Sequence, residues 1–206
     1  MKKSKNSLLA IIAVIFLGIT WFFIAEEPPI LKLPNDWEGI IIESPPTPAP
    51  TFTFTQHNGK AFSEKDFLNK WSLIFFGYTN CPDVCPNAMR VFAQMAQDPK
   101  LPATEFIFAT VDPKRDNTSR IAEFVNFFGK DFIGLTGDRK EIDKFARPFG
   151  VIYDYEGDVN SPDYIVTHFA AIYVIDPKAR LRAYILPPHN KIRVQEAYEL
   201  IRNYYE

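Results

Sequence analysis

Two cysteines, four residues apart, are the side chains of this chain best suited to chemistry. Cys81 and Cys85 are its only thiols in 206 residues, so the pair can form one small disulfide, a redox couple or part of a metal site. A nearly continuous apolar run at residues 71–78 precedes them, which is typical of a strand buried on both faces. Proline is tolerated only in the first turn of a helix, so Pro86 predicts a helix that begins no earlier than about Asp83. Free N–H groups and the helix dipole favour thiolate over thiol at such a helix N-terminus.

A metal site built on two thiolates needs a third donor, and the chain has three histidines. His168 begins a predicted buried strand, residues 167–175, whose start would face the thiol loop across the sheet edge. His57 falls at a predicted hairpin tip, where a solvated turn residue is expected. His189 falls in a loop before a helix cap and is a distant second choice as a ligand. Two soft thiolates and one imidazole suit Cu(I), which accepts three ligands, whereas zinc prefers a closed set of four.

Strands and helices alternate along the region that must position these side chains. Asn58-Gly59 is a hairpin turn signal after the period-two pattern of residues 51–55. Further strands are predicted at residues 71–78, 104–111, 132–135, 167–175 and 181–186, and helices at about 83–97, 118–128, 138–147 and from 190 onward, with Thr118 and Asn190 as caps. Such alternation requires right-handed crossovers over a mostly parallel sheet, which ends here in an antiparallel pair. The predicted fold class is α/β, a thioredoxin-like fold with an N-terminal β-hairpin extension, preceded by one transmembrane helix.

The N-terminal segment has the composition of a membrane anchor. Residues 8–25 carry no charge, follow three lysines and would measure roughly 27 Å as a helix at about 1.5 Å per residue. Because the positive charges come first, the N-terminus should stay in the cytoplasm and the rest of the chain should be exported. A cleaved signal peptide is the alternative, but residues 23–25 lack a small residue at the first position of a cleavage site. We therefore expect a single-pass protein of the bacterial inner (cytoplasmic) membrane with its domain on the periplasmic side.

The chain is thus expected to comprise four segments: a cytoplasmic N-terminus at residues 1–7, a transmembrane anchor at 8–25, a proline-rich linker at 26–50 and a thioredoxin-like copper-binding domain at 51–206. The linker holds seven prolines, which is typical of a stiff, extended spacer. A net charge of −2 and a pI near 6.0 provide no basic surface for nucleic acid. The 47% of hydrophobic residues, 19 of them Phe, indicates a folded body rather than a disordered one.

Several ordered motifs resemble the Sco (SenC) copper-delivery proteins of cytochrome c oxidase assembly. The resemblance covers about residues 52–189 and rests on Phe76-Gly77-Tyr78-Thr79-x-Cys81-Pro82-Asp83-Val84-Cys85-Pro86, Val111-Asp112-Pro113-x-Arg115-Asp116, Gly134-Leu135-Thr136-Gly137 and His168 ahead of Ile175-Asp176-Pro177. It implies a membrane-anchored metallochaperone that holds copper, as Cu(I) with Cu(II) as a second state, through Cys81, Cys85 and His168. The implied partners are the copper-centre subunit of cytochrome c oxidase, whose dinuclear centre would receive the copper, and an upstream copper donor or thiol reductase.

Two positions depart from the family pattern. Asn80 stands where the family commonly has histidine before the first cysteine, and Thr167 and Phe169 flank His168 where the family usually has Asp and Ser. The three residues implied as copper ligands are retained. The departures therefore concern the surroundings of the ligands, which tune metal affinity and partner choice.

Other functions use the same thiols. A thiol–disulfide oxidoreductase that keeps the cysteines of the oxidase copper centre reduced would need Cys81 and Cys85 as redox thiols, without metal. Thioredoxins, however, usually carry a cis-proline where this chain has Ile165-Val166-Thr167-His168. A peroxiredoxin-like peroxidase is disfavoured because Thr79 lies two residues before Cys81, not three. A purely structural disulfide is disfavoured because so short a loop contributes little stability. We expect a carrier rather than an enzyme.

Overall fold

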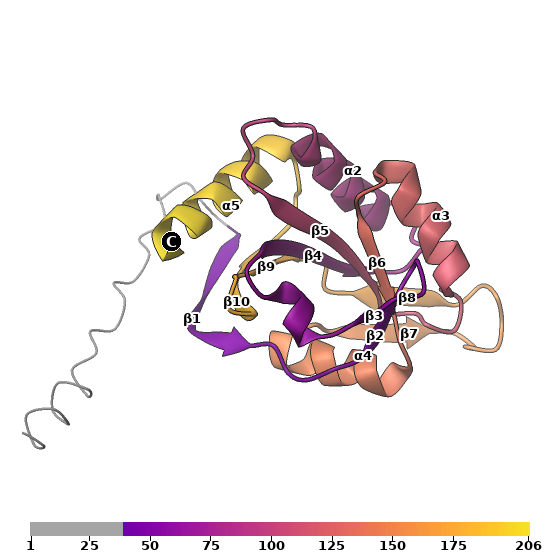
Figure 1. Cartoon of the computed structure of the whole chain (residues 1–206). Helices are drawn as coiled ribbons and strands as arrows, with labels where there is room; N and C mark the ends of the chain where they lie inside the picture. The colour runs from indigo at the N-terminus through magenta and orange to yellow at the C-terminus, as the bar shows by residue number, and fades with distance from the viewer. Residues whose placement is uncertain (1–38) are drawn as a thin grey trace, which may run out of the picture. The chain divides into compact units, whose positions relative to one another are not determined.

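The computed structural model describes residues 39–206, and Figure 1 shows their arrangement. The expected cytoplasmic N-terminus, the anchor at residues 8–25 and the first part of the linker lie outside the described residues. Between residues 39 and 206, no helix combines the length and the apolar character needed to cross a bilayer.

The core of the fold is an eight-stranded sheet with strand order β1-β10-β9-β4-β5-β6-β2-β3. Its central strands are β4 (Trp71–Gly77), β5 (Thr104–Thr110) and β6 (Ile133–Thr136), which pair in parallel, and β9 (Ile172–Ile175) and β10 (Arg180–Ile185), which are antiparallel to their neighbours. The α/β class is confirmed, but the expectation of a mostly parallel sheet was wrong. Parallel pairing is confined to β4–β5 and β5–β6 among the described strands, whereas the other five neighbouring pairs of the sheet are antiparallel.

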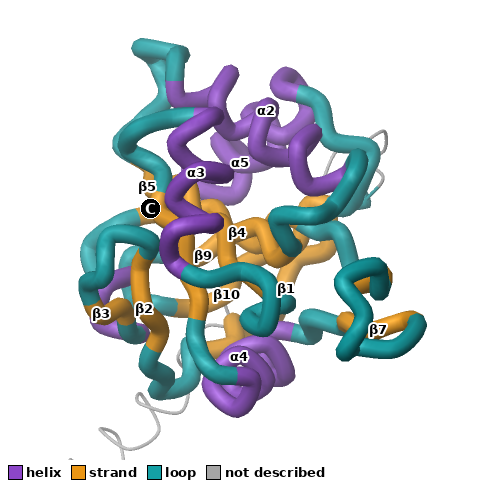
Figure 2. Tube along the Cα trace, turned by 90° about the vertical axis from the view of Figure 1, so that its right-hand side faces the viewer, coloured by secondary structure: helices purple, strands orange, loops and turns teal. Residues whose placement is uncertain are grey.

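Four helices cover the two faces of this sheet. Helices α2 (Val84–Ala96), α3 (Thr118–Phe128) and α5 (Lys191–Tyr205) lie on one face, and α4 (Arg139–Ala146) lies on the other, followed by the 3-10 helix η2 (Arg147–Phe149), as Figures 1 and 2 show. All seven residues of β4 are buried, as its continuous apolar sequence predicted. Helices therefore cover both faces of the sheet, so a site can lie only at its edges or at the ends of its strands.

The helix boundaries follow from their caps. Asp83 is the N-cap of α2, which confirms the start expected from Pro86, and Asn190 caps α5 by accepting a hydrogen bond from the N–H of Arg193. For α3 the cap is Asn117 rather than the expected Thr118, because the Asn117 side chain accepts a hydrogen bond from the backbone N–H of Arg120, three residues further on.

The N-terminal part of the domain starts earlier than expected. Strand β1 (Ile40–Pro48) lies within the segment expected to be a spacer, and it pairs antiparallel with β10 at the sheet edge. The register of this pair shifts between Ile42 and Thr47, which is where Pro45 and Pro46 stand. Prolines are tolerated at such an irregularity on an edge strand, so a proline-rich composition did not exclude pairing.

The predicted N-terminal hairpin is confirmed. Strands β2 (Phe54–Gln56) and β3 (Ala61–Phe62) pair antiparallel, with Gly59 at φ +84° in the turn between them, and the short 3-10 helix η1 (Glu64–Phe67) follows. Strand β2 also pairs with β6, which attaches the hairpin to the main sheet. The aromatic side chains of Phe52, Phe62 and Phe67 are buried beneath it.

One predicted strand is in fact two elements. Residues 167–175 were expected to form a single strand, but β8 (Ile165–His168) pairs with β7 (Tyr153–Glu156) in a separate two-stranded sheet, and β9 begins only at Ile172. Strand β7 was not predicted. We call β7 and β8 with the loop that joins them, residues 153–168, the histidine ribbon, because His168 is its last residue.

Candidate metal centre

The two thiols lie at the N-terminal end of α2, just past the carboxyl end of the buried strand β4. Cys81 is in the connecting loop and Cys85 is in the first turn of the helix, as predicted. Both are buried free thiols, with Cys81 7% exposed and Cys85 fully buried. The backbone N–H of Cys85 lies 3.4 Å from Cys81 Sγ and donates to it. The loop thus turns one sulfur toward the free N–H groups of the helix.

A glycine makes room for the second sulfur. A Cβ atom at Gly77, the last residue of β4, would lie 2.7 Å from Cys85 Sγ and 3.1 Å from the ring of Phe108. The contact with Cys85 Sγ is closer than real Cβ atoms approach and the one with Phe108 is tight, so any side chain here would displace the Cys85 sulfur.

The structure brings His168 to this pair. Its Nε2 lies 3.4 Å from Cys85 Sγ, and the two sulfurs and one imidazole nitrogen all lie within 4.8 Å of one another. The imidazole stands perpendicular to the rings of Phe75 and Tyr78, with ring centres 5.8 and 6.1 Å away. Its other nitrogen, Nδ1, is buried without a hydrogen-bond partner among the described residues. The three predicted site residues therefore meet in one place.

The two thiols differ sharply in acidity. A hydrogen bond from Cys85, together with contacts to His168 and backbone N–H groups, lowers the pKa of Cys81 to about 4 although burial opposes it. Burial, reinforced by the neighbouring Cys81 thiolate, raises the pKa of Cys85 well above its usual range. Burial and the two sulfurs also raise the pKa of Tyr78. At neutral pH the two sulfurs therefore keep one proton between them, and a bound metal ion could replace that proton.

The other two histidines are not part of this cluster. His189 is buried and its Nε2 pairs with the carbonyl of Ile185 at 3.0 Å, while burial lowers its pKa. His57 is half-buried at the hairpin, where its Nδ1 accepts a hydrogen bond from the N–H of Gly134 at 3.1 Å. It is thus a structural residue that ties the hairpin to β6, rather than the solvated turn residue that was expected.

A buried carboxylate holds the thiol loop from behind. Asp116 accepts hydrogen bonds from the N–H and hydroxyl of Thr79, at 2.9 and 2.6 Å, and from the hydroxyl of Thr110 at 2.6 Å. Burial raises its pKa even though these bonds lower it. The motif around Asp116 was noticed in the sequence, but its role was not predicted, since the contact spans 37 residues.

A second set of residues, Asp112, Arg115 and Tyr164, attaches the histidine ribbon to the core. Arg115 Nε binds Asp112 at 2.5 Å, its Nη1 donates to the carbonyl of Tyr164 at 2.8 Å, and the Tyr164 hydroxyl donates to Asp112. The guanidinium lies over the Tyr164 ring at 3.6 Å and faces Tyr78 at 5.6 Å. We call these three residues the Arg115 clamp. It links the loop after β5 to the strand that carries His168, which no local sequence signal indicated.

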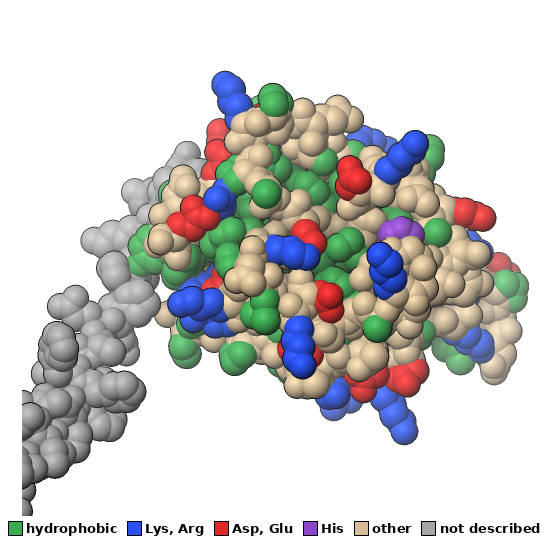
Figure 3. Space-filling model, viewed as in Figure 1, with side chains coloured by type: hydrophobic (Ala, Val, Ile, Leu, Met, Phe, Trp, Pro, Cys, Tyr) green, Lys and Arg blue, Asp and Glu red, His purple; other side chains and the backbone are tan. Residues whose placement is uncertain are grey.

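The cluster opens into a cavity of about 320 Å³. Its walls come from the thiol loop, the start of α2 and the end of the histidine ribbon: Tyr78, Cys81, Pro82, Asp83, Val84, Val166, Thr167, His168 and Ala170. Acidic and basic side chains are interspersed on the face of the molecule shown in Figure 3, in keeping with the net charge of −2. Among the residues that line the cavity, Asp83 is the one acidic side chain and there is no lysine or arginine, so its walls are largely apolar.

Comparisons with known proteins identify the family. The family model for SCO1/SenC matches residues 43–205. The human "Protein SCO1 homolog, mitochondrial" is 37% identical over 137 residues, which cover 65% of this chain and 46% of that protein. The chain therefore spans about half the length of such curated relatives.

Two solved structures extend the comparison. The structure of Bradyrhizobium japonicum ScoI with copper bound is 32% identical, with a TM-score of 0.63 over 76% of this chain and 99% of the other. The crystal structure of Arabidopsis thaliana ScoI with copper bound is 29% identical, with a TM-score of 0.68 over 75% and 98%. By its sequence match and its fold, the chain belongs to the SCO1/SenC family.

Proposed function

We propose that this protein is a copper metallochaperone whose cargo is held by Cys81, Cys85 and His168. The observation that carries the proposal is the convergence of their two sulfurs and one Nε2 within 4.8 Å, at a helix N-terminus and below an open cavity. Soft sulfur and imidazole donors in a set of three favour Cu(I). A site of three donors with an open side can pass its ion to another set of thiolates, which is what a carrier requires.

The family supports a partner for this carrier, and the N-terminal sequence supports a location. Relatives in the family were solved with copper bound, which supports copper as the cargo here. We infer that the recipient is the dinuclear copper centre of cytochrome c oxidase during assembly, with an upstream copper donor or thiol reductase serving the carrier. The uncharged segment at residues 8–25, preceded by lysines, supports a single-pass anchor in the bacterial inner membrane, with the domain on the periplasmic side.

One observation favours a second candidate, a thiol–disulfide oxidoreductase acting on the cysteines of that copper centre. The pKa of Cys81 is lowered to about 4, while that of Cys85 is raised. An acidic, slightly exposed thiol beside a buried neutral one is the arrangement of an attacking and a resolving cysteine. Attack and resolution involve only sulfur, so the exchange does not need the imidazole as a metal ligand, and this separates the two functions.

Strains carrying single substitutions test the choice. For a carrier, His168→Ala should lower oxidase activity nearly as severely as Cys81→Ser, because loss of the imidazole leaves copper with two ligands. Added copper should rescue the histidine variant at least partly, since its thiols still capture metal. Oxidase activity is measured in both strains with and without copper in the medium, against a His57→Ala strain as the control for loss of a histidine elsewhere. Normal activity of His168→Ala beside an inactive Cys81→Ser would instead establish the oxidoreductase.

A further inference from the structure

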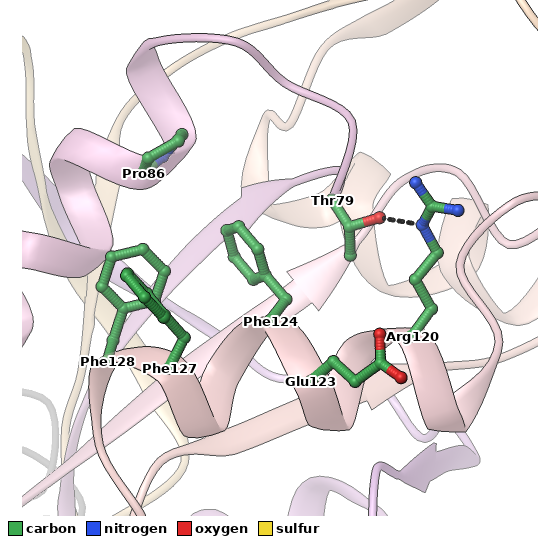
Figure 4. Close-up of a pocket in the computed structure, with 7 residues that line it drawn as sticks. All are labelled: Thr79, Pro86, Arg120, Glu123, Phe124, Phe127 and Phe128. Atoms are coloured by element: carbon green, nitrogen blue, oxygen red, sulfur yellow. Dashed lines mark hydrogen bonds between the residues drawn. The ribbon is translucent and has the colours of Figure 1, made fainter.

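A second groove lies beside the thiol loop, outside the copper site. Figure 4 shows its walls, which enclose about 560 Å³. They are formed by Pro86 of α2 and by Phe124, Phe127 and Phe128 of α3, with Arg120 and Glu123 toward the other end of α3. Phe127 is 84% exposed, the largest exposed fraction of any large hydrophobic side chain among the described residues. Together with Phe124 and Phe128 it forms an apolar surface beside polar residues, which is typical of the patches that proteins use for interaction.

The polar end of this groove is joined to the thiol loop by Arg120. Its Nε donates to the hydroxyl of Thr79 at 2.8 Å, and its Nη2 donates to the side-chain oxygen of Asn80. Thr79 and Asn80 are the two residues directly before Cys81. A molecule bound to Arg120 would therefore lie next to the loop that carries Cys81, one of the proposed copper ligands.

The charge of Arg120 is not neutralised within the described part of the protein. Both of its hydrogen-bond acceptors are neutral oxygens, and the guanidinium is exposed. A carboxylate would bind it with two charge-assisted bonds, which are stronger than bonds to neutral oxygens. Glu123, one turn along α3, is also exposed, and Figure 4 shows no hydrogen bond between it and Arg120. The polar end of the groove therefore offers an exposed cation and an exposed anion beside an apolar wall.

We propose that this groove is the docking surface for the protein that receives the copper, which presents a carboxylate to Arg120 and an apolar side chain to Phe127. The proposal rests on the proposed function, because a copper acceptor must be held beside Cys81 to take the ion. The aromatic wall supplies apolar contact and Arg120 supplies specificity, the combination that forms the central contacts of protein interfaces. A protein is favoured over a small ligand because the groove is wide open and Phe127 stands out from it.

The test uses the full-length chain, reduced and loaded with Cu(I), and the copper-free soluble copper-centre domain of the cytochrome c oxidase of the same organism as the probe. Dissociation constants for the complex and rates of copper transfer are measured for the parent, Phe127→Ser and Arg120→Gln. Ile192→Ser is the matched control, because Ile192 is 68% exposed on α5 and lies outside this groove. The Cu(I) affinity of each variant is measured separately.

Phe127→Ser is expected to weaken the complex at least tenfold and to slow transfer, while its Cu(I) affinity equals that of the parent and Ile192→Ser behaves as the parent. Arg120→Gln should also weaken the complex, and its affinity should depend less on salt than that of the parent, since a charge pair is lost.

If the parent transfers copper and both groove variants bind and transfer equally well, the docking surface is refuted and the carrier function stands. If the parent transfers no copper, the proposed function fails and this inference fails with it. If Phe127→Ser changes only the oligomeric state of the chain, the groove is a contact between copies and the proposal is overturned.

Discussion

The thiol loop and the histidine ribbon bring their ligands to the same point by different means. Strand β4, which leads to the thiols, is paired on both sides by β5 and β9 and is buried along its whole length. The ribbon pairs only within itself. It is attached to the core by side chains: the Arg115 clamp, Tyr155 donating to the carbonyl of Val111 at 2.5 Å, and Tyr153 donating to Asp143 at 2.6 Å.

This difference divides the site into a rigid part and an adjustable part. A backbone ladder buried on both faces opens only when the domain unfolds, whereas a two-stranded ribbon held by a few polar contacts can shift at lower free energy. The sulfurs are therefore held whether or not metal is present, while the position of the imidazole depends on the clamp. A carrier that must bind and then release its ion gains from having one adjustable ligand.

The largest expected effect comes from disturbing the rigid part at Gly77. In Gly77→Ala the new Cβ would lie 2.7 Å from Cys85 Sγ, so the sulfur must move. We expect the free energy of unfolding to fall by about 1–3 kcal/mol and Cu(I) affinity to fall at least tenfold. Denaturant titration and competition with a Cu(I) chelator measure the two quantities.

Gly59→Ala is the control, because Gly59 has φ +84° in the distant hairpin and no atom near its missing side chain. It should destabilise the domain without altering Cu(I) affinity, which separates displacement of the sulfur from general loss of stability. An unchanged Cu(I) affinity in Gly77→Ala would show that the thiol loop adapts, and the distinction between rigid and adjustable parts would fail.

The rigid part was also the part that the sequence predicted well. A continuous apolar strand, a loop with two cysteines and a proline in the first turn are local signals, so residues 71–78 and the start of α2 near Asp83 could be located from neighbouring residues alone. The structure places His168, the histidine chosen from the sequence, beside the two thiols, although its strand was misassigned.

The adjustable part was predicted poorly because its contacts are long-range. Residues 167–175 have the pattern of one strand, yet β8 pairs with β7 instead of extending β9, a choice made by packing rather than by local propensity. The Arg115 clamp joins residues about 50 positions apart, and Asp116 reaches back 37 positions to Thr79. Strand β1 was missed for a related reason, since its prolines disfavour a strand except at an irregular edge.

A smaller effect is expected from loosening the adjustable part. Tyr164→Phe removes the hydroxyl that donates to Asp112 and leaves the thiols untouched. We expect Cu(I) affinity to fall by about fivefold, or roughly 1 kcal/mol, because the imidazole is less well placed. Tyr204→Phe is the control, since that hydroxyl is buried without a hydrogen-bond partner among the described residues.

A double-mutant cycle shows whether this effect passes through the histidine. In a chain that already carries His168→Ala, Tyr164→Phe should cause no further loss of Cu(I) affinity, because no imidazole remains to be positioned. The nitrogen hyperfine signal of the Cu(II) form should also be weaker or broader in Tyr164→Phe than in the parent. Equal losses with and without His168 would mean that the clamp acts on the thiols, and the comparison between the two regions would need revision.

The smallest effect concerns protons and sharpens the difference between the two sulfurs themselves. The pKa of Cys81 is about 4 in the folded chain, below the ordinary value of 9.0, and the largest cause is the hydrogen bond from Cys85. Between pH 4 and pH 9, folding therefore releases a proton from Cys81. The contribution of this thiol to stability is complete above pH 9 and is lost as the pH falls toward 4.

In the reduced parent, alkylation of Cys81 by iodoacetamide should stay near its full rate down to about pH 5. In Cys85→Ala the pKa of Cys81 should rise, and the midpoint of the rate profile should move to higher pH, whereas His57→Ala should leave it in place. A midpoint that does not move in Cys85→Ala would show that the helix N-terminus and His168, rather than the second thiol, keep Cys81 ionised.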